Sequence, residues 1–459
     1  MSRFNSWLAK LLFAGFLLIN ASSLSAATNN IVDVTKNGVT GDGVTLNTAS
    51  IQKAIDDCAA AGGGTISFPA GHYLTGTIQI KSNVTLHLDK DATLLGSTDA
   101  ADYRNLDPFI DGSGHPLGDA LIVALDATNV GIEGEGTVDG QSPKLKTKEK
   151  TYSMRPFLVR WVRCQNVTVR NVHLINPGAW TLNFFQTQGA TIEGVTIRSR
   201  DLGMQNNDGI NLDSSANVQV RHCDVISGDD ALVIKSTSAS QPSHDITASD
   251  CQLSSHANAI KLGTESIGGF ANISISDCQI TNTQMAGIAL YAVDGGDLRN
   301  VTISNITMDG AVVPIAIRLG ARLKTFREGD QPKPAAGKLS EVTIQNIRAK
   351  NVGLIGLLIN GIPSHPVESL ELQNITIEVP GGGTAEQAKT QLAEKETAYP
   401  EFNMFGKTVP AYGIYARHVD GLKLDGVRIT TLQPDARPAA VFIDIENMTQ
   451  TDLGAKQLP

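Results

Sequence analysis

Three aspartates in the middle of the chain have the spacing of a catalytic group. Asp208 stands just before a short apolar run at 210–212, and Asp229 and Asp230 stand just before another at 232–234. If the two runs are neighbouring parallel strands, about 4.8 Å apart, their apolar alternation aligns Asp208 with Asp230. Like charges held this close raise the pKa of at least one carboxyl group. Carboxyl groups whose pKa values are pushed apart can act as general acid and general base.

Two other interpretations of these aspartates are open. Asp and Asn before strands also form turns and internal ladders, and clustered carboxylates also suit a hard cation such as calcium. Stacking three anions without a ligand or a task is costly, which favours the catalytic interpretation of the group. No C-x-x-C or H-x-x-x-H pattern supports a zinc site. We therefore expect neither a metal nor a cofactor.

A repeat runs through most of the chain and predicts the fold. Its pattern is Asn-Val-x-Ile or a close variant, and successive copies from residue 166 to residue 300 begin 24, 27, 28, 27 and 28 residues apart. Each unit holds short alternating segments separated by Gly, Asn and Asp. A period in the twenties with strands and no helices predicts an all-β, single-stranded parallel β-helix, a solenoid. Longer later intervals predict inserted loops around 324–338 and 381–410.

The N-terminal part of the chain predicts a targeting segment followed by a cap. Arg3 and Lys10 precede an apolar run, and Ser25-Ala26-Ala27 offers a small-residue cleavage site, so residues 1–27 are expected to be a signal peptide. The remaining 28–459 form the catalytic β-helix, with 28–64 as its cap region. Residues 48–61 have one apolar face and a possible N-cap in Thr48, which predicts a short helix covering the open end of the strands.

The net charge limits the classes of partner molecule, and the spacing of the cysteines indicates how they pack. The formal net charge of −9 argues against a nucleic-acid partner. No apolar stretch is long enough to span a bilayer, so we expect no membrane partner. The expected signal peptide predicts a secreted or periplasmic location. We also expect a monomer. Cys223, Cys251 and Cys278 are spaced by 28 and 27 residues, one repeat each. They are expected to be stacked, inward-facing thiols that pack as small apolar residues.

Because coils of a β-helix stack in register, columns of residues can be predicted. One inward column runs through the second strand of five successive units, at Ile210, Leu232, Ile260, Ile288 and Ile315. The column two residues earlier holds Asp208, Asp230, Asn258, Ala286 and Val313, and the outward column three residues later holds Asp213, Lys235, Gly263, Tyr291 and Arg318. Polar groups therefore gather on a few coils of one face, as in a shallow groove for an extended polymer.

Over most of its length the sequence resembles glycoside hydrolase family 28, the polygalacturonase-like enzymes. The family's N-T-D motif is matched by Asn206-Asn207-Asp208 and its paired-Asp motif by Gly228-Asp229-Asp230. Further matching stretches are GTVDG at 136–140, NPGAW at 176–180 and GTES at 263–266. The resemblance implies a right-handed parallel β-helix, and a glycosidase that hydrolyses a pectic or related acidic polysaccharide with inversion. By the same resemblance Asp229 is the general acid, while Asp208 and Asp230 hold and deprotonate the water.

The sequence departs from the family pattern at two places. The family's G-H-G histidine should fall at Asn258, with His256 two residues away, and its R-I-K cations should fall at Ala289 and Tyr291. His256 taken alone is an ordinary loop histidine.

Replacements for the missing cations are predicted from the columns. We expect Lys261 and Arg318 to line the subsite next to the aspartates, with Tyr291 packing between them as a face on which a sugar stacks. The full set of predicted substrate-binding residues is Asn206, Asn258, His256, Lys261, Lys235, Tyr291 and Arg318. Two other functions remain open, a polysaccharide lyase that uses calcium and a Lys or Arg base, and a non-catalytic carbohydrate-binding β-helix.

Overall fold

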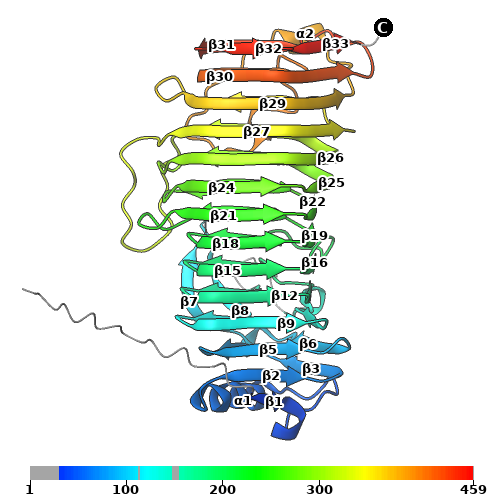
Figure 1. The fold of residues 1–459 in the computed structure, drawn as a ribbon, viewed down its shortest axis with the longest axis vertical. Helices are drawn as coiled ribbons and strands as arrows, with labels where there is room; N and C mark the ends of the chain where they lie inside the picture. The colour runs from blue at the N-terminus through cyan, green and yellow to red at the C-terminus, as the bar shows by residue number, and fades with distance from the viewer. Residues whose placement is uncertain (1–29, 112–113, 147–154, 458–459) are drawn as a thin grey trace, which may run out of the picture.

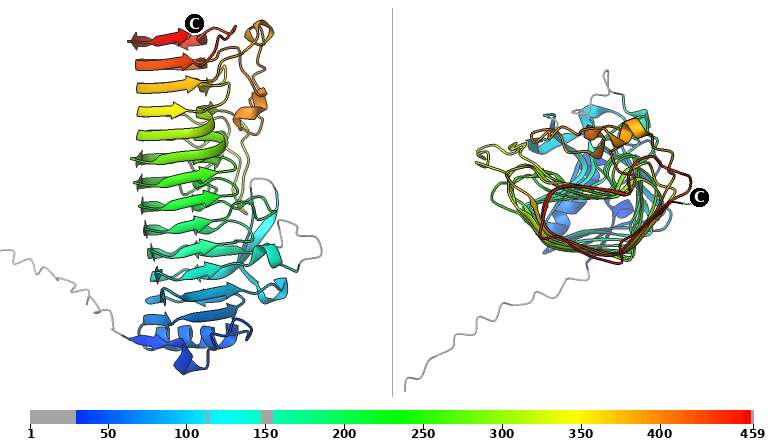
Figure 2. Two further views of the ribbon diagram at one scale, coloured as in Figure 1. Left: turned by 90° about the vertical axis from the view of Figure 1, so that its right-hand side faces the viewer. Right: turned by 90° about the horizontal axis from the view of Figure 1, so that it is seen from above.

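The protein is a right-handed parallel β-helix, as predicted (Figure 1). The computed structural model describes residues 30–111, 114–146 and 155–457, so the predicted signal peptide lies outside the described residues. Within them all strands belong to one continuous sheet, which winds into a tube of superposed coils (Figure 2). No helix in these ranges is both long and apolar enough to cross a bilayer.

Each coil contributes a strand to three faces. The first face contains β1 (Ile31–Asp33), β2 (Gly64–Phe68), β5 (Val84–Leu88), β9 (Thr128–Gly134), β12 (Gln165–Arg170), β15 (Gln188–Glu193), β18 (Ala216–Arg221), β21 (Ser243–Ser249) and β24 (Phe270–Ser276). The second contains β3 (Gly71–Thr75), β6 (Ala92–Gly96), β10 (Thr137–Asp139), β13 (His173–Ile175), β16 (Thr196–Arg198), β19 (Asp224–Ser227) and β22 (Gln252–Ser255). The third contains β4 (Ile78–Ile80), β8 (Pro116–Leu125), β11 (Phe157–Val162), β14 (Leu182–Phe185), β17 (Ile210–Asp213), β20 (Leu232–Ser236), β23 (Ile260–Ser266), β28 (Leu357–Asn360) and β31 (Ala440–Glu446).

Later coils run through the corners as long bent strands. These are β25 (Gln279–Ala292), β26 (Leu298–Leu319), β27 (Leu339–Lys350), β29 (Val367–Val379) and β30 (Ile414–Thr431), followed at the C-terminal end by β32 (Thr449–Thr451) and β33 (Gly454–Gln457). One antiparallel strand, β7 (Arg104–Ile110), folds back on β8 to form a hairpin at the side of the stack.

The repeated Asn-Val motif marks the start of each strand on the first face. Asn166, Asn217, Asn272 and Asn300 all have φ between 53° and 57°, in the left-handed region that Asn tolerates better than most residues. The side chains of Asn166, Asn272 and Asn300 also bond between coils, as from Asn300 Nδ2 to Asn272 Oδ1 at 2.8 Å. The motif therefore turns the chain at a corner and links one coil to the next, while the alternating apolar residues after it fill the core.

The cysteine prediction is confirmed in its main feature. All five cysteines, which lie in the described part of the chain, are buried free thiols. Cys223, Cys251 and Cys278 belong to the same apolar core, one in each of three successive coils.

The predicted capping helix is present as α1 (Thr48–Ala60), with Ile51, Ala54, Ile55 and Cys58 buried against the first coils. Its N-cap is Asn47, not Thr48 as predicted from the sequence, and no side chain caps the helix. Thr48 is instead the first helical residue, and its hydroxyl accepts a 2.7 Å hydrogen bond from the Gly76 amide. The hydroxyl thus ties the cap to the coil beneath it.

Two long connections interrupt the coils near the predicted insertions. Residues 320–338 join β26 to β27, and residues 380–413 join β29 to β30, carrying α2 (Ala385–Ala388) and the short 3-10 helix η5 (Phe402–Phe405). The 380–413 segment and the β7–β8 hairpin lie on the same side of the stack (Figure 2, left).

We expect the free energy of unfolding to depend on the inward columns far more than on outward positions of the same strand. Ile303 in β26 is fully buried between Ile275 and Ile344 of the adjacent coils, whereas its neighbour Thr302 is only partly buried. Ile303→Ala should cost about 2–5 kcal/mol, and Thr302→Ala less than about 0.5 kcal/mol. Urea unfolding followed by circular dichroism measures both, and equal losses would contradict the assigned core.

Candidate active site

A pocket of about 410 Å³ opens on the third face, where the loops entering its strands meet the 380–413 segment. Its walls come from seven separate parts of the chain, including the tip of the β7–β8 hairpin. The lining residues are Asp111, Trp180, Met204, Gln205, Asn206, Asp208, Gly228, Asp229, Asp230, Lys235, His256, Ala257, Lys261, Glu265, Gln284, Met285, Tyr399 and Glu401. All three predicted catalytic aspartates are among them.

The predicted register brings the aspartates together. In β17 and β20, Ile210 pairs with Leu232 and Leu212 with Ile234, as the apolar alternation predicts. Asp208 precedes β17 by two residues and Asp230 precedes β20 by two, so they occupy equivalent places on adjacent coils. Backbone bonds continue through this position, since the Gly209 amide donates to the Asp230 carbonyl at 2.8 Å.

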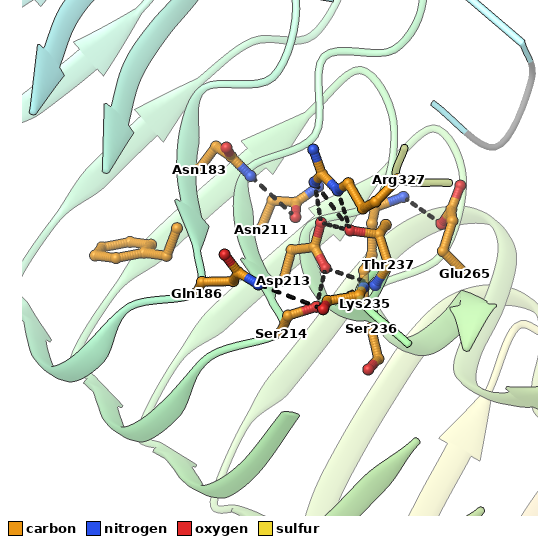
Figure 3. A network of polar contacts seen from close by, with 12 residues as sticks. Asn183, Gln186, Asn211, Asp213, Ser214, Lys235, Ser236, Thr237, Glu265 and Arg327 are labelled. Atoms are coloured by element: carbon orange, nitrogen blue, oxygen red, sulfur yellow. Dashed lines mark hydrogen bonds and ion pairs between the residues drawn. The ribbon is translucent and has the colours of Figure 1, made fainter. Parts of the chain in front are cut away.

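Asp208 is buried and bonded on one side. Its Oδ2 atom accepts a hydrogen bond from Asn211 Nδ2 at 2.9 Å and lies 3.8 Å from Lys235 Nζ. Lys235 is 7% exposed and makes a closer contact, 3.0 Å, with Glu265 Oε2 (Figure 3). Its ammonium also lies 4.9 Å from the centre of the Trp180 ring. Lys235 therefore bridges two carboxylates against an aromatic wall.

Asp230 is bonded more tightly than Asp208. One carboxylate oxygen accepts from the Asn258 amide and from Asn258 Nδ2, at 3.0 and 2.9 Å, and the other lies 3.0 Å from Lys261 Nζ. Lys261 is 3% exposed and contacts Glu401 Oε1 at 2.6 Å. Glu401 also accepts from Asn258 Nδ2 at 3.3 and 3.4 Å. These contacts hold Asp230 as the carboxylate of a buried ion-pair cluster.

Asp229 has no such cation and remains partly exposed at the pocket. Its Oδ1 atom accepts a 2.9 Å hydrogen bond from the Asp230 amide, and its own carbonyl is held by the hydroxyls of Ser227 and Ser255. Among the described residues it forms no ion pair. Its backbone is thus fixed while its carboxyl group faces the pocket.

The pKa values follow from this difference in partners. Desolvation, together with the nearby Asp230 charge, raises the pKa of Asp229 to about 7. Desolvation also raises the pKa of Asp208 well above its usual value, against the opposing charge of Lys235. Burial lowers the pKa of Lys235 and of Lys261, but the neighbouring carboxylates more than offset burial and the pKa of each lysine is raised. The pocket therefore holds two ammonium groups with raised pKa values and two carboxyl groups, those of Asp208 and Asp229, whose pKa values are also raised.

The 320–338 connection is fastened beside the site through Arg327. Its guanidinium lies 3.2 Å from Asp213 Oδ2 and donates to Thr237 Oγ1 (Figure 3). It also lies 3.6 Å from the centre of the Phe185 ring. Asp213 also accepts from the Thr237 amide at 2.8 Å. The network joins the ends of β17 and β20 and so fixes the strands that carry Asp208 and Lys235.

Some of the predicted substrate-binding residues lie at the pocket. Asn206, His256, Lys235 and Lys261 all line it, and Asn206 and His256 also face a neighbouring pocket that includes Arg155. Asn258 is fully buried and lies behind the pocket wall, bonded to Asp230. Asn258 therefore positions the side chain of Asp230.

Tyr291 and Arg318 are not at the pocket, contrary to the expectation from the outward columns. They do pair with each other across β25 and β26, as predicted. The 380–413 segment covers them, leaving Tyr291 1% and Arg318 3% exposed. Tyr291 packs in an apolar cluster with Phe402 and Phe405, and Arg318 donates to three backbone carbonyls, those of Gly361, Glu394 and Lys395. The sequence gives no means of telling which face an insertion will cover.

Several pocket residues were not predicted. Trp180 stands two residues before β14, whose Leu182 pairs with Ile210, so the same columns that located Asp208 also locate Trp180. Glu265 lies on β23 with Lys261, in the stretch 263–266 that matches the family, but the sequence assigns no role to it. Tyr399 and Glu401 come from the 380–413 segment, outside the repeat, and no periodic signal identifies them.

Lysines contact four carboxyl groups of the site, those of Asp208, Asp230, Glu265 and Glu401. Within the described residues, no group of three or more His, Cys, Asp or Glu side chains is arranged to hold a metal ion. The polar contacts described above are the arrangement of a hydrolytic site in which several carboxyl groups have different protonation states.

Comparison with known proteins identifies the family to which the chain belongs. The model of the family described as "Glycosyl hydrolases family 28" matches residues 58–398. A probable polygalacturonase of Vitis vinifera is 27% identical over 382 residues, covering 78% of this chain and 76% of its own length. An endo-polygalacturonase of Pectobacterium carotovorum subsp. carotovorum is 27% identical over 352 residues, covering 72% of this chain and 84% of its own.

A solved structure extends the likeness to three dimensions. The hyperthermoactive exopolygalacturonase of Thermotoga maritima superposes with a TM-score of 0.66 at 25% identity, covering 76% of this chain and 87% of its own. The family model matches well over half of the chain, and it includes all three aspartates of the pocket. This chain belongs to glycosyl hydrolases family 28 and is a glycosidase.

Proposed function

We propose that the protein hydrolyses glycosidic bonds of a pectic or related acidic polysaccharide with inversion at the anomeric carbon. The observation that carries the proposal is that Asp208, Asp229 and Asp230 line one pocket while differing in their cationic partners. Relatives named as polygalacturonases support a pectic substrate. Inversion requires one protonated carboxyl group to protonate the leaving oxygen and a carboxylate to activate a water on the opposite side of the sugar.

Asp229 is suited to be the general acid. Its pKa of about 7 leaves it largely protonated in mildly acidic solution, and its partly exposed carboxyl group faces the pocket. A proton donor with a pKa near the working pH combines a high fraction of the acid form with easy proton transfer.

Asp230 and Asp208 are suited to hold the water. Asp230 is fixed by its contacts with Lys261 and Asn258, which place it to accept the proton of an attacking water. Asp208 lies at the equivalent place one coil earlier and can accept or donate the second hydrogen bond that orients this water. The two lysines are bound to carboxylates, which makes either one a poor base for the lyase reaction considered from the sequence.

Export is a further part of the proposal. It is supported by the charged start, short apolar run and small-residue site of residues 1–27. A secreted or periplasmic location would bring the enzyme to plant or algal polysaccharide outside the cell. N-terminal sequencing of the mature protein tests this, and an uncleaved N-terminus would contradict it.

Asp229→Asn should abolish most of the activity without unfolding the protein. The substitution keeps the size of the side chain and removes the proton that the leaving oxygen needs, so we expect kcat to fall by about 10²–10⁴-fold. The measurement is the release of reducing ends from pectic polysaccharides, with the anomer of the first product read by proton NMR. Near-normal turnover, or a first product with retained configuration, would contradict the mechanism.

Activity should decline as the pH rises through about 7. Asp229 has a raised pKa, so its proton is present below about pH 7 and lost above it, and general acid catalysis is lost with it. Because the three carboxyl groups interact, the profile reports the pKa of the group as a whole. The measurement is kcat/KM between about pH 5 and pH 9, with the unfolding midpoint followed over the same range as a control. A value that stays constant up to about pH 9 would rule out Asp229 as the acid.

A further inference from the structure

The pocket carries an excess of negative charge. Six carboxyl side chains line it, those of Asp111, Asp208, Asp229, Asp230, Glu265 and Glu401, against two lysines and one histidine. If two of the carboxyl groups hold protons, four carboxylates still face two ammonium groups, which leaves an excess of two negative charges. A further anion entering this space meets a repulsive field that the walls of a small pocket screen poorly.

Both lysines are already engaged. Lys235 lies between Glu265, at 3.0 Å, and Asp208, at 3.8 Å. Lys261 lies between Glu401, at 2.6 Å, and Asp230, at 3.0 Å. Each ammonium group is nearly enclosed, with 7% and 3% of the residue exposed. A uronate carboxylate would have to displace one of these partners and leave it buried and unpaired, which is costly.

The rest of the pocket has the chemistry of a neutral sugar site. Tyr399 is 48% exposed at the pocket, and Trp180 supplies a second aromatic wall. The flat face of an aromatic side chain can pack against the apolar face of a sugar ring, and its polar edge can meet the sugar's hydroxyl groups. Carboxylates such as Glu265 and Glu401 accept hydrogen bonds, and the hydroxyl groups of a neutral sugar are the donors that match them.

We propose that the enclosed pocket binds a neutral sugar residue of the polysaccharide and excludes a uronate, and that Glu401 determines this specificity by occupying Lys261. The inference rests on the proposed function, because it takes a polysaccharide as the substrate, but it concerns binding and not turnover. Uronate residues elsewhere in the same polymer remain outside the pocket. Glu401 is supplied by the 380–413 segment, so the specificity is set by an insertion placed over an otherwise regular stack of coils.

The test is a binding measurement with two ligands that differ only in charge. A hexamer of α-1,4-linked galacturonate and the same hexamer after reduction of its carboxyl groups to primary alcohols share length, linkage and stereochemistry. Each is titrated by calorimetry into the Asp229→Asn variant, which cannot turn it over. We expect the reduced hexamer to bind at least tenfold more tightly, a difference of about 1.4 kcal/mol. The variant itself removes one acidic group from the pocket, so it works against this result.

Glu401 is tested by adding a second substitution to Asp229→Asn. Glu401→Gln removes the charge that holds Lys261, so the affinity for the galacturonate hexamer should rise at least fivefold. The preference for the reduced hexamer should therefore become smaller. Glu401→Asp keeps the charge and should keep the preference. Glu386→Gln is the matched control, because it makes the same change at an exposed position of the same segment that does not line the pocket. It should leave both affinities unchanged, and thermal unfolding of every variant confirms that it is folded.

Several results would overturn the proposal. The galacturonate hexamer binding as tightly as the reduced one, or neither hexamer binding, would exclude a neutral sugar pocket of this kind. Equal effects of Glu401→Gln and Glu386→Gln would remove Glu401 from the specificity. Failure of the proposed function is a separate observation, because it would appear as absent hydrolysis or retained configuration with the wild-type enzyme.

Discussion

Backbone hydrogen bonds between successive coils are the constraint on which the rest of the structure depends. They fix each strand over its neighbour without a shift along most of the third face, from β14 through β17 to β20. A residue that lies two positions before a strand therefore meets its counterpart two positions before the next strand. This is how Asp208 and Asp230, far from each other in any extended chain, come to share a wall of one pocket.

Two ion-pair clusters form on adjacent coils, although their lysines stand in different columns, because Lys261 pairs with Val233 and not with Lys235. In each, a lysine on one coil contacts an aspartate that precedes the strand of the previous coil: Lys235 with Asp208, and Lys261 with Asp230. Each lysine then meets a glutamate on its far side. Asp229 occupies the turn between these clusters and has neither partner, and desolvation by its surroundings is what raises its pKa. The turn before β20 thus places an aspartate that contacts a lysine, Asp230, directly beside one whose pKa is raised, Asp229.

The regular part of the fold could be predicted from the sequence because its signals repeat. The Asn-Val motif, the apolar columns and the place of the three aspartates all follow from a period near 27 residues. The same reasoning located Lys235 and Lys261, and it would have located Trp180 had the aspartate column been extended one coil earlier. The cap was predicted too, although its first residue was misassigned because the hydroxyl of Thr48 serves a neighbouring coil.

The irregular part could not be predicted, and it is the part that shapes the pocket. Tyr291 and Arg318 lie on the predicted outward columns, yet the 380–413 segment covers them with Phe402 and Phe405 and turns an open face into core. The same segment places Tyr399 and Glu401 over the aspartates. An insertion has no register of its own, so its position depends on contacts that have no period, such as those of Arg318 with the carbonyls of Glu394 and Lys395. The coils therefore place the three aspartates of the pocket, whereas the insertion places the residues that close the pocket over them.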